Sequence, residues 1–253
     1  MSQPTLAEYW TAADLVYTDN REGKGNDLAP PASSGLTLLL DSGAVNSKWL
    51  SDGFFAQALQ DTSGNIIIAF EGSLPFEASA YGRGSASADS QILAGQTPHA
   101  FSDALVFTAD VQQYLVQHNL ASNPVYLTGH SLGGAEAEYV ASKDGYSGVT
   151  FGAPGTLAPV YPDLGTGQTF TNYVDYGDPV GNFGTHFGTV QEVGPRSDAT
   201  TTAVLEKILG PALGALVAET LFHPLSHYAA DLNISTSLVA SSSSVGHFHS
   251  IAG

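Results

Sequence analysis

The sequence predicts an α/β fold with a mostly parallel central sheet flanked by helices. Short apolar segments typical of strands alternate along the chain with segments of helical periodicity. One of them, Ile-Ile-Ile-Ala-Phe at residues 66–70, is apolar without alternation, as in strands covered on both faces. A serine, Ser131, stands between two glycines where a strand-like run meets a helix-like run. The 253 residues, 43% of them apolar, fit one domain spanning 1–253.

The composition excludes several classes of function. Seven basic against 24 acidic residues give a net charge of −17, which argues against a nucleic-acid partner because few cations are available for phosphates. The chain has no cysteine, which rules out disulfides and thiolate chemistry.

The surface composition favours a secreted protein. Charged residues make up 12% of the chain, against about 25% in average proteins, so uncharged polar residues must cover much of the surface. The first residues nevertheless lack the basic and apolar regions of a signal peptide. The longest uncharged apolar-rich stretch, residues 208–218, is far shorter than the roughly 20 residues that span a bilayer, so we expect no transmembrane segment.

The N-terminal part predicts a helix and two strands. Residues 6–17 place their apolar side chains on one helical face. Residues 49–60 and 65–70 are typical of strands, and Asp-Thr-Ser-Gly at 61–64 predicts the turn between them.

The middle of the chain predicts an irregular segment followed by regular elements. Residues 74–98 are rich in Gly, Ala and Ser without a steady period, so we interpret them as an insertion or lid without an amphipathic helix. A helix is expected over residues 103–119. Strands are expected at 148–151 and 170–174, and a weaker one at 187–193.

Near the C-terminus, residues 208–222 are apolar. They either fill the core or form an apolar binding site, and we interpret them as core. Pro224 predicts the start of a final helix, because proline is favoured at the first helical position.

Ser131 is the candidate nucleophile. Its segment, Gly-His-Ser-Leu-Gly-Gly at residues 129–134, has the form of a nucleophile elbow, in which Gly129 and Gly133 leave space for a sharp strand-to-helix turn. A serine hydroxyl needs a general base, and the base needs an acid that fixes its tautomer.

Two residues compete for each of these partner roles. Asp178 follows the expected strand at 170–174 and precedes a proline, and Asp175, nearer the strand, is the alternative acid. His223 is expected on a loop before the final helix, where it is free to approach the serine, whereas His227 would lie one turn inside that helix. We therefore favour Asp178 and His223, with His227 as the alternative base.

No metal site is predicted. His247 and His249 would share one face of a strand, but no third or fourth ligand accompanies them. The serine chemistry requires no cofactor, and calcium binding is left open by the sequence.

Four motifs resemble those of the class 3 lipases, α/β-hydrolases that cleave acylglycerol esters. Residues 66–73 resemble the family's apolar strand followed by Phe-Arg-Gly-Ser/Thr, and residues 125–134 resemble its elbow. Residues 149–154 resemble its Thr-Phe-Gly-x-Pro segment, and residues 178–180 its Asp-Pro-Val. Together the motifs cover roughly residues 5–230.

The resemblance implies an α/β-hydrolase fold and a triacylglycerol lipase that acts on lipid, at a lipid–water interface, through a Ser-Asp-His triad and an acyl-enzyme. It also implies Ser73 and Leu132 as oxyanion-hole residues. Glu71 departs from the family, which has arginine there. A phospholipase or short-chain esterase is the alternative, and a hydrolase-like binding protein without catalysis is a remote one.

Overall fold

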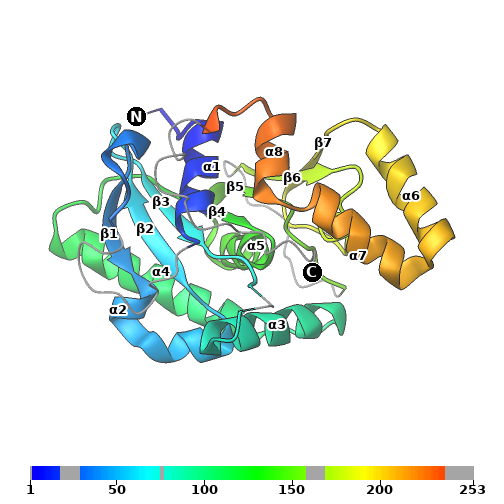
Figure 1. Cartoon of the computed structure of the whole chain (residues 1–253). Helices are drawn as coiled ribbons and strands as arrows, with labels where there is room; N and C mark the ends of the chain where they lie inside the picture. The colour runs from blue at the N-terminus through cyan, green and yellow to red at the C-terminus, as the bar shows by residue number, and fades with distance from the viewer. Residues whose placement is uncertain (1, 18–28, 75–76, 158–168, 237–253) are drawn as a thin grey trace.

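A seven-stranded sheet forms the centre of the computed structural model, which describes residues 2–17, 29–74, 77–157 and 169–236 (Figure 1). Its strands lie side by side in sequence order, β1 and β2 antiparallel to their neighbours and β3 to β7 mutually parallel. The strands are β1 Thr37–Asp41, β2 Ala56–Gln60, β3 Ile66–Phe70, β4 Val125–His130, β5 Ser147–Phe151, β6 Phe170–Asp175 and β7 Thr189–Val193. The carboxyl ends of the five parallel strands therefore meet at one edge.

Helices cover both faces of the sheet (Figure 1). The helices are α1 Leu6–Leu15, α2 Ser42–Asn46, α3 Ala80–Leu93, α4 His99–Gln117, α5 Leu132–Asp144, α6 Ser197–Leu209, α7 Pro211–Phe222 and α8 Leu225–Asp231, with short 3₁₀ turns at Ala32–Ser34 and Ser47–Asp52. On β3, Ile67 belongs to the core shared with α1 and α8, and its neighbours Ile66 and Ile68 belong to the core shared with α4 and α5. Burial on both faces explains why this strand is continuously apolar.

Most of the predicted elements lie where the sequence placed them. The first helix, the strand β3, the helix α4 and the strands β5 to β7 match the expectation within a few residues at each end. The prediction of a strand over residues 49–60 is wrong in its first half. There the chain forms a 3₁₀ turn that ends at Gly53, whose φ of +81° is a left-handed conformation, and only then enters β2.

The prediction that residues 74–98 lack an amphipathic helix is also wrong, because α3 occupies Ala80–Leu93. Four of the six buried residues of this helix are glycine, alanine or serine, so hydropathy gives little sign of its buried face. Gly84 lies so close to the backbone of Gly53 that a Cβ atom on it would fall 2.4 Å from the Gly53 nitrogen. Farther along, Ala88 and Ile92 join Leu132 in a small core, which attaches α3 to the start of α5.

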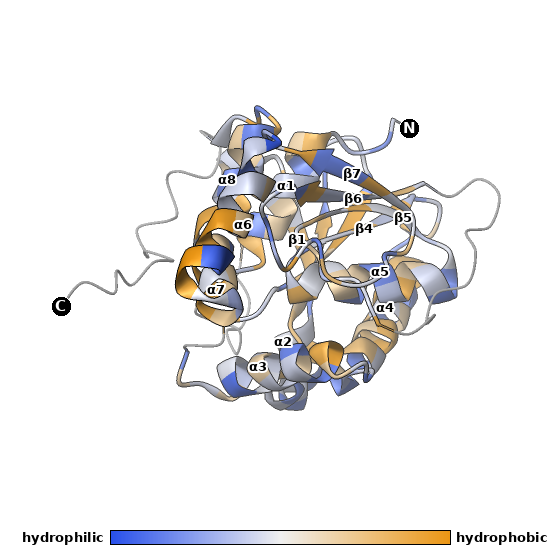
Figure 2. Ribbon diagram, turned by 90° about the vertical axis from the view of Figure 1, so that its right-hand side faces the viewer, coloured by the Kyte–Doolittle hydropathy of each residue, from blue (hydrophilic) through white to orange (hydrophobic). Residues whose placement is uncertain are grey.

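The interpretation of residues 208–222 as core is wrong for most of their large side chains. The helices α6 and α7 form a hairpin in which Gly214 permits close packing, since a Cβ atom there would lie 2.3 Å from the Glu206 Cα. Ile208 is 73% exposed, and Leu213 and Leu216 are each 50% exposed. Figure 2 shows these apolar helices at the side of the molecule. Among the described residues, no helix has the length and apolar character to cross a bilayer.

Two glutamates on α5 are completely buried, and they differ in their partners. Glu138 accepts hydrogen bonds from the His186 ring, at 2.9 Å, and from the Phe187 amide, at 2.7 Å. Both carboxyl oxygens of Glu136 are without a hydrogen-bond partner. Burial, together with the nearby negative charge of Asp103, raises the pKa of Glu136 well above its usual value of 4.5.

We predict opposite effects when each glutamate is replaced by methionine. Folded Glu136 retains a proton that the unfolded chain releases above pH 4.5, so the destabilisation of the folded state by this buried carboxyl group grows with pH. Glu136→Met should therefore raise the free energy of unfolding at pH 8 by about 1–3 kcal/mol, and by less at pH 5. Glu138→Met should lower it by about 3–5 kcal/mol, since it leaves the partners of Glu138 unpaired. Urea unfolding at both pH values measures this, and equal losses in the two variants would contradict it.

Candidate active site

Ser131 occupies a strained turn between β4 and α5. Its backbone has φ 57° and ψ −130°, in a region that residues with a side chain rarely adopt. The turn needs both flanking glycines, because a Cβ atom on Gly129 would lie 2.3 Å from the Gly133 carbonyl oxygen and one on Gly133 would lie 2.1 Å from the Phe70 carbonyl oxygen. The close packing of α5 on β3 and β4 thus holds the serine at the carboxyl edge of the sheet.

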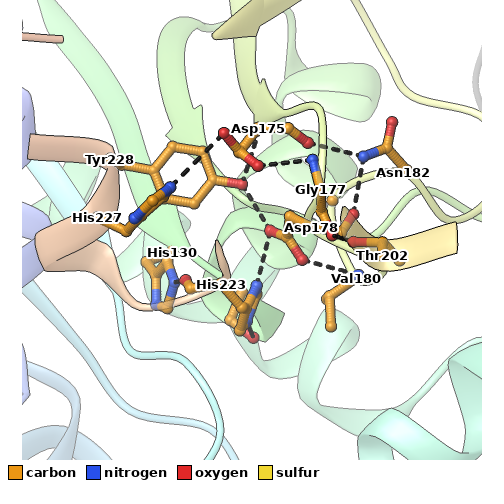
Figure 3. A network of polar contacts seen from close by, with 12 residues as sticks. His130, Asp175, Gly177, Asp178, Val180, Asn182, Thr202, His223, His227 and Tyr228 are labelled. Atoms are coloured by element: carbon orange, nitrogen blue, oxygen red, sulfur yellow. Dashed lines mark hydrogen bonds and ion pairs between the residues drawn. The ribbon is translucent and has the colours of Figure 1, made fainter. Parts of the chain in front are cut away.

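The structure brings Ser131, His223 and Asp178 together in one chain of hydrogen bonds. The Ser131 hydroxyl donates to His223 Nε2 at 2.8 Å. His223 Nδ1 donates to Asp178 Oδ2 at 2.9 Å (Figure 3). The His223 side chain is 12% exposed and Asp178 is completely buried. His223 lies directly after α7, on the short loop before α8. This is the order of groups that activates a serine for attack on a carbonyl carbon.

Several donors keep Asp178 ionised. The Tyr228 hydroxyl donates to the same oxygen as His223, and the Val180 amide donates to Oδ1 at 2.8 Å. Burial alone would raise the pKa of Asp178, but the charge of His223 and these hydrogen bonds outweigh it, so the pKa lies below its usual value. Sequence reasoning missed Tyr228, because a tyrosine in a helix carries no signal of such a contact.

Asp178 also controls the proton affinity of His223. Burial by itself would lower the pKa of His223, but the charge and hydrogen bond of Asp178, with smaller contributions from Glu219 and Asp89, raise it above 6.5. The imidazole is thus a stronger base than a free histidine side chain.

A second imidazole, His130, anchors the loop that holds His223. Its Nε2 donates to the His223 carbonyl oxygen at 2.7 Å, and its Nδ1 accepts from the Tyr17 hydroxyl at 2.8 Å. Burial, reinforced by the neighbouring His223, lowers the pKa of His130 to about 3, so the ring is neutral at physiological pH. His130 therefore positions the backbone of His223, a contact that its place in the sequence does not reveal.

Ser73 and Leu132, the residues expected to form an oxyanion hole, lie at the same edge of the sheet. Ser73 follows β3, which pairs with β4, and its hydroxyl donates to Asp89 on α3 at 2.8 Å. Leu132 is the first residue of α5, where backbone amides have no carbonyl partner within the helix. Burial raises the pKa of Asp89 to about 6, although the Ser73 hydrogen bond opposes this. Sequence reasoning did not identify Asp89.

The alternative acid and base contact each other instead of the serine. His227 Nε2 lies 3.6 Å from Asp175 Oδ2, on the side of Tyr228 away from His223 (Figure 3). His247 and His249 lie outside the described residues.

The mostly parallel sheet, its flanking helices and the serine turn define an α/β-hydrolase fold. The chain is similar to a fungal lipase solved as an inhibitor complex and described as a model for interfacial activation, with 19% identity over 77% of this chain and 80% of that one and a TM-score of 0.50. It also matches the Rhizomucor miehei lipase in complex with its propeptide, with 19% identity over 69% of this chain and 61% of that one and a TM-score of 0.43. No protein-family model matches the chain, and no curated protein sequence matches it. At this level of identity, the likeness to the first of these structures shows the fold alone.

We predict that Asp178→Asn lowers the pKa of His223 from its raised value. The substitution removes the carboxylate charge that opposes the effect of burial, so the proton is lost at lower pH. NMR titration of the histidine ring signals measures this pKa. His186 is an internal control, because its raised pKa depends on Glu138 and should not change. An unchanged His223 signal would contradict the proposed source of its basicity.

Proposed function

We propose that this protein is a serine-dependent hydrolase of carboxylic esters, and that its preferred substrates are triacylglycerols. The observation that supports this most directly is the continuous hydrogen-bond chain from the Ser131 hydroxyl through His223 to the ionised Asp178. The lipase-like fold agrees with it.

The reaction proceeds in two half-reactions. His223 accepts the Ser131 proton as the Ser131 oxygen attacks the ester carbonyl carbon, while Ser73 and the Leu132 amide stabilise the oxyanion. His223 then donates this proton to the departing alcohol, which leaves an acyl group on Ser131. A water molecule, activated by the same imidazole, releases the fatty acid and restores the serine. No step requires a cofactor.

The exposed hairpin of α6 and α7 supports a lipid substrate. Its exposed aliphatic side chains, with exposed fractions from 41% to 73%, lie on two adjacent helices. The second of these helices, α7, leads directly into His223. The exposed residues are Val204, Ile208, Leu209, Leu213, Leu216 and Leu221. Aliphatic side chains gathered on exposed helices are typical of proteins that bind lipid surfaces. We propose that this hairpin inserts into the surface of the lipid substrate and places the active site at the interface.

The proposal also covers the domain organisation, the lid and the location of the enzyme. The chain is one catalytic domain, α3 within the segment 74–98 occupies the place of a lid, and the enzyme is secreted. The scarcity of charged residues, 12% of the chain, supports secretion. The Ser73 hydrogen bond to Asp89 supports the lid, because it joins an oxyanion-hole residue to α3.

We predict that a fluorophosphonate probe labels Ser131 in the native protein. Ser131→Ala should remove the label and lower the hydrolysis of a nitrophenyl ester by about 10⁴-fold or more. Ser63→Ala is the matched control, because Ser63 is exposed in the turn between β2 and β3, at the edge of the sheet opposite Ser131. Mass spectrometry locates the modified residue. A protein that remains unlabelled and inactive would support the non-catalytic alternative.

We also predict that the double variant Leu213→Ser/Leu216→Ser loses activity on emulsified long-chain triacylglycerol by about 10-fold or more, because less apolar area enters the lipid. Hydrolysis of a dissolved short-chain ester should not change. Val116→Ser is the control, since Val116 is 65% exposed but lies near the end of α4 that leads into the amino end of β4, at the opposite edge of the sheet. Activity on dissolved esters alone would favour the esterase alternative. A preference for phospholipid emulsions would favour the phospholipase alternative.

A further inference from the structure

A second group of polar side chains lies behind the acid of the candidate active site. Asp175 ends β6, Asp198 lies in the first turn of α6, and His227 and Asp231 lie one turn apart on α8. One possible ligand atom from each of Asp175, Asp198 and His227 lies within 4.8 Å of the others. His227 Nε2 is 3.4 Å from Asp231 Oδ2 and 3.6 Å from Asp175 Oδ2. We call these four residues the rear cluster.

The buried atoms of the rear cluster lack hydrogen-bond partners. Asp175 is completely buried, and its Oδ2 has no partner, nor do His227 Nε2 and Asp231 Oδ2. The other Asp175 oxygen accepts from the Gly177 amide at 2.6 Å, which fixes the carboxylate with its unpaired oxygen toward His227. Unpaired buried polar groups are rare because each costs about 1–3 kcal/mol. Burial, together with the charges of Asp231 and Asp198, raises the pKa of Asp175 to about 7.

The backbone leaves space at this position. Gly194, at the end of β7, has a φ of +73°, and a Cβ atom on it would lie 2.0 Å from Asp175 Oδ2 and 3.1 Å from Asp231 Oδ2. Only glycine keeps the two carboxylate oxygens accessible to a ligand between them.

An ion pair alone does not account for this arrangement. One imidazole nitrogen carries at most one proton, which cannot form good hydrogen bonds with both carboxylates at 3.4 and 3.6 Å. These two separations are instead close to the distance between neighbouring ligand atoms in a tetrahedral zinc site. Bonds of about 2.0–2.1 Å from the ion to nitrogen and oxygen place the ligand atoms about 3.3–3.4 Å apart.

We propose that Asp175, Asp198 and His227 bind one divalent transition-metal ion beside Asp231, with zinc as the ion that fits best. An imidazole combined with carboxylates selects zinc over calcium, which prefers six to eight oxygen ligands.

The bound ion joins β6, α6 and α8, and it acts on the active site only through the protein. Tyr228, the neighbour of His227, donates to Asp178 and accepts a hydrogen bond from the Asp175 amide at 3.2 Å. Fixing His227 and Asp175 therefore fixes the tyrosine that orients Asp178. This proposal does not depend on ester hydrolysis.

The test uses the whole protein without an affinity tag, freed of metal with a chelator. Calorimetric titration with Zn²⁺ should show one site, and thermal unfolding should move to higher temperature with saturating Zn²⁺. Titration with Co²⁺ should produce the strong visible absorption of a tetrahedral complex.

Two variants assign the site. His227→Gln and Asp198→Asn are partly exposed positions, so the metal-free variants should fold, which circular dichroism checks. Each should weaken Zn²⁺ binding by about 100-fold or more, because even the loss of an outer-shell partner costs 10- to 100-fold. His118→Gln and Glu192→Gln, exposed positions outside the cluster, should bind as the native protein does.

Each of the remaining outcomes overturns the proposal. The first is a native protein that shows no saturable Zn²⁺ binding. The second is full Zn²⁺ affinity in both cluster variants, which would place the ion elsewhere. The third is stabilisation by Ca²⁺ but not by Zn²⁺, which would exclude the imidazole ligand. Fluorophosphonate labelling of Ser131 is measured in parallel, so that failure of the metal site and failure of the proposed hydrolase are distinguished.

Discussion

The candidate site depends on how closely α5 packs against the ends of β3 and β4. This approach is possible only because Gly129 and Gly133 lack side chains, since Cβ atoms on them would collide with backbone oxygens. It forces Ser131 into a backbone conformation that costs about 1–3 kcal/mol, which the surrounding packing must supply. In return the serine hydroxyl stands clear of the sheet edge, next to the first amides of a helix. A larger residue at either glycine would displace the Ser131 hydroxyl and the first amides of α5 together.

The imidazole is held from two directions. Asp178 orients the ring of His223 and supports its positive charge, while neutral His130 holds its backbone carbonyl. His130 is the last residue of β4 and adjoins Ser131, so the strand that leads into the candidate nucleophile also carries the anchor for the candidate base. With Tyr17 bound to the other ring nitrogen, both hydrogen-bonding atoms of His130 are used. Because the buried ring is neutral, His130 holds the backbone of His223 without adding a charge beside it.

The sequence predicted the features that follow from local patterns. The apolar run of β3, the glycines around Ser131 and the helix after Pro224 are such patterns, and each lies where it was expected. The helix α3 was missed because glycine, alanine and serine mediate its packing, and these residues give no hydrophobic period. The exposed hairpin of α6 and α7 was misjudged, because apolar composition does not distinguish a core helix from one that faces outward. The contacts of Tyr228 and His130 depend on tertiary structure alone.

Two aspartates three residues apart and two histidines four residues apart form two separate pairs, and burial alone does not distinguish them. Asp175 and Asp178 are both completely buried, yet the pKa of Asp178 is lowered and that of Asp175 is raised to about 7. The difference lies in the partners. Asp178 receives hydrogen bonds at both oxygens, whereas one oxygen of Asp175 receives none and the charges of Asp231 and Asp198 act on this carboxyl group. An acid that orients a base must remain ionised, so the geometry of the donors favours Asp178 for that role in the proposed mechanism, and it leaves one oxygen of Asp175 open to the proposed metal ion.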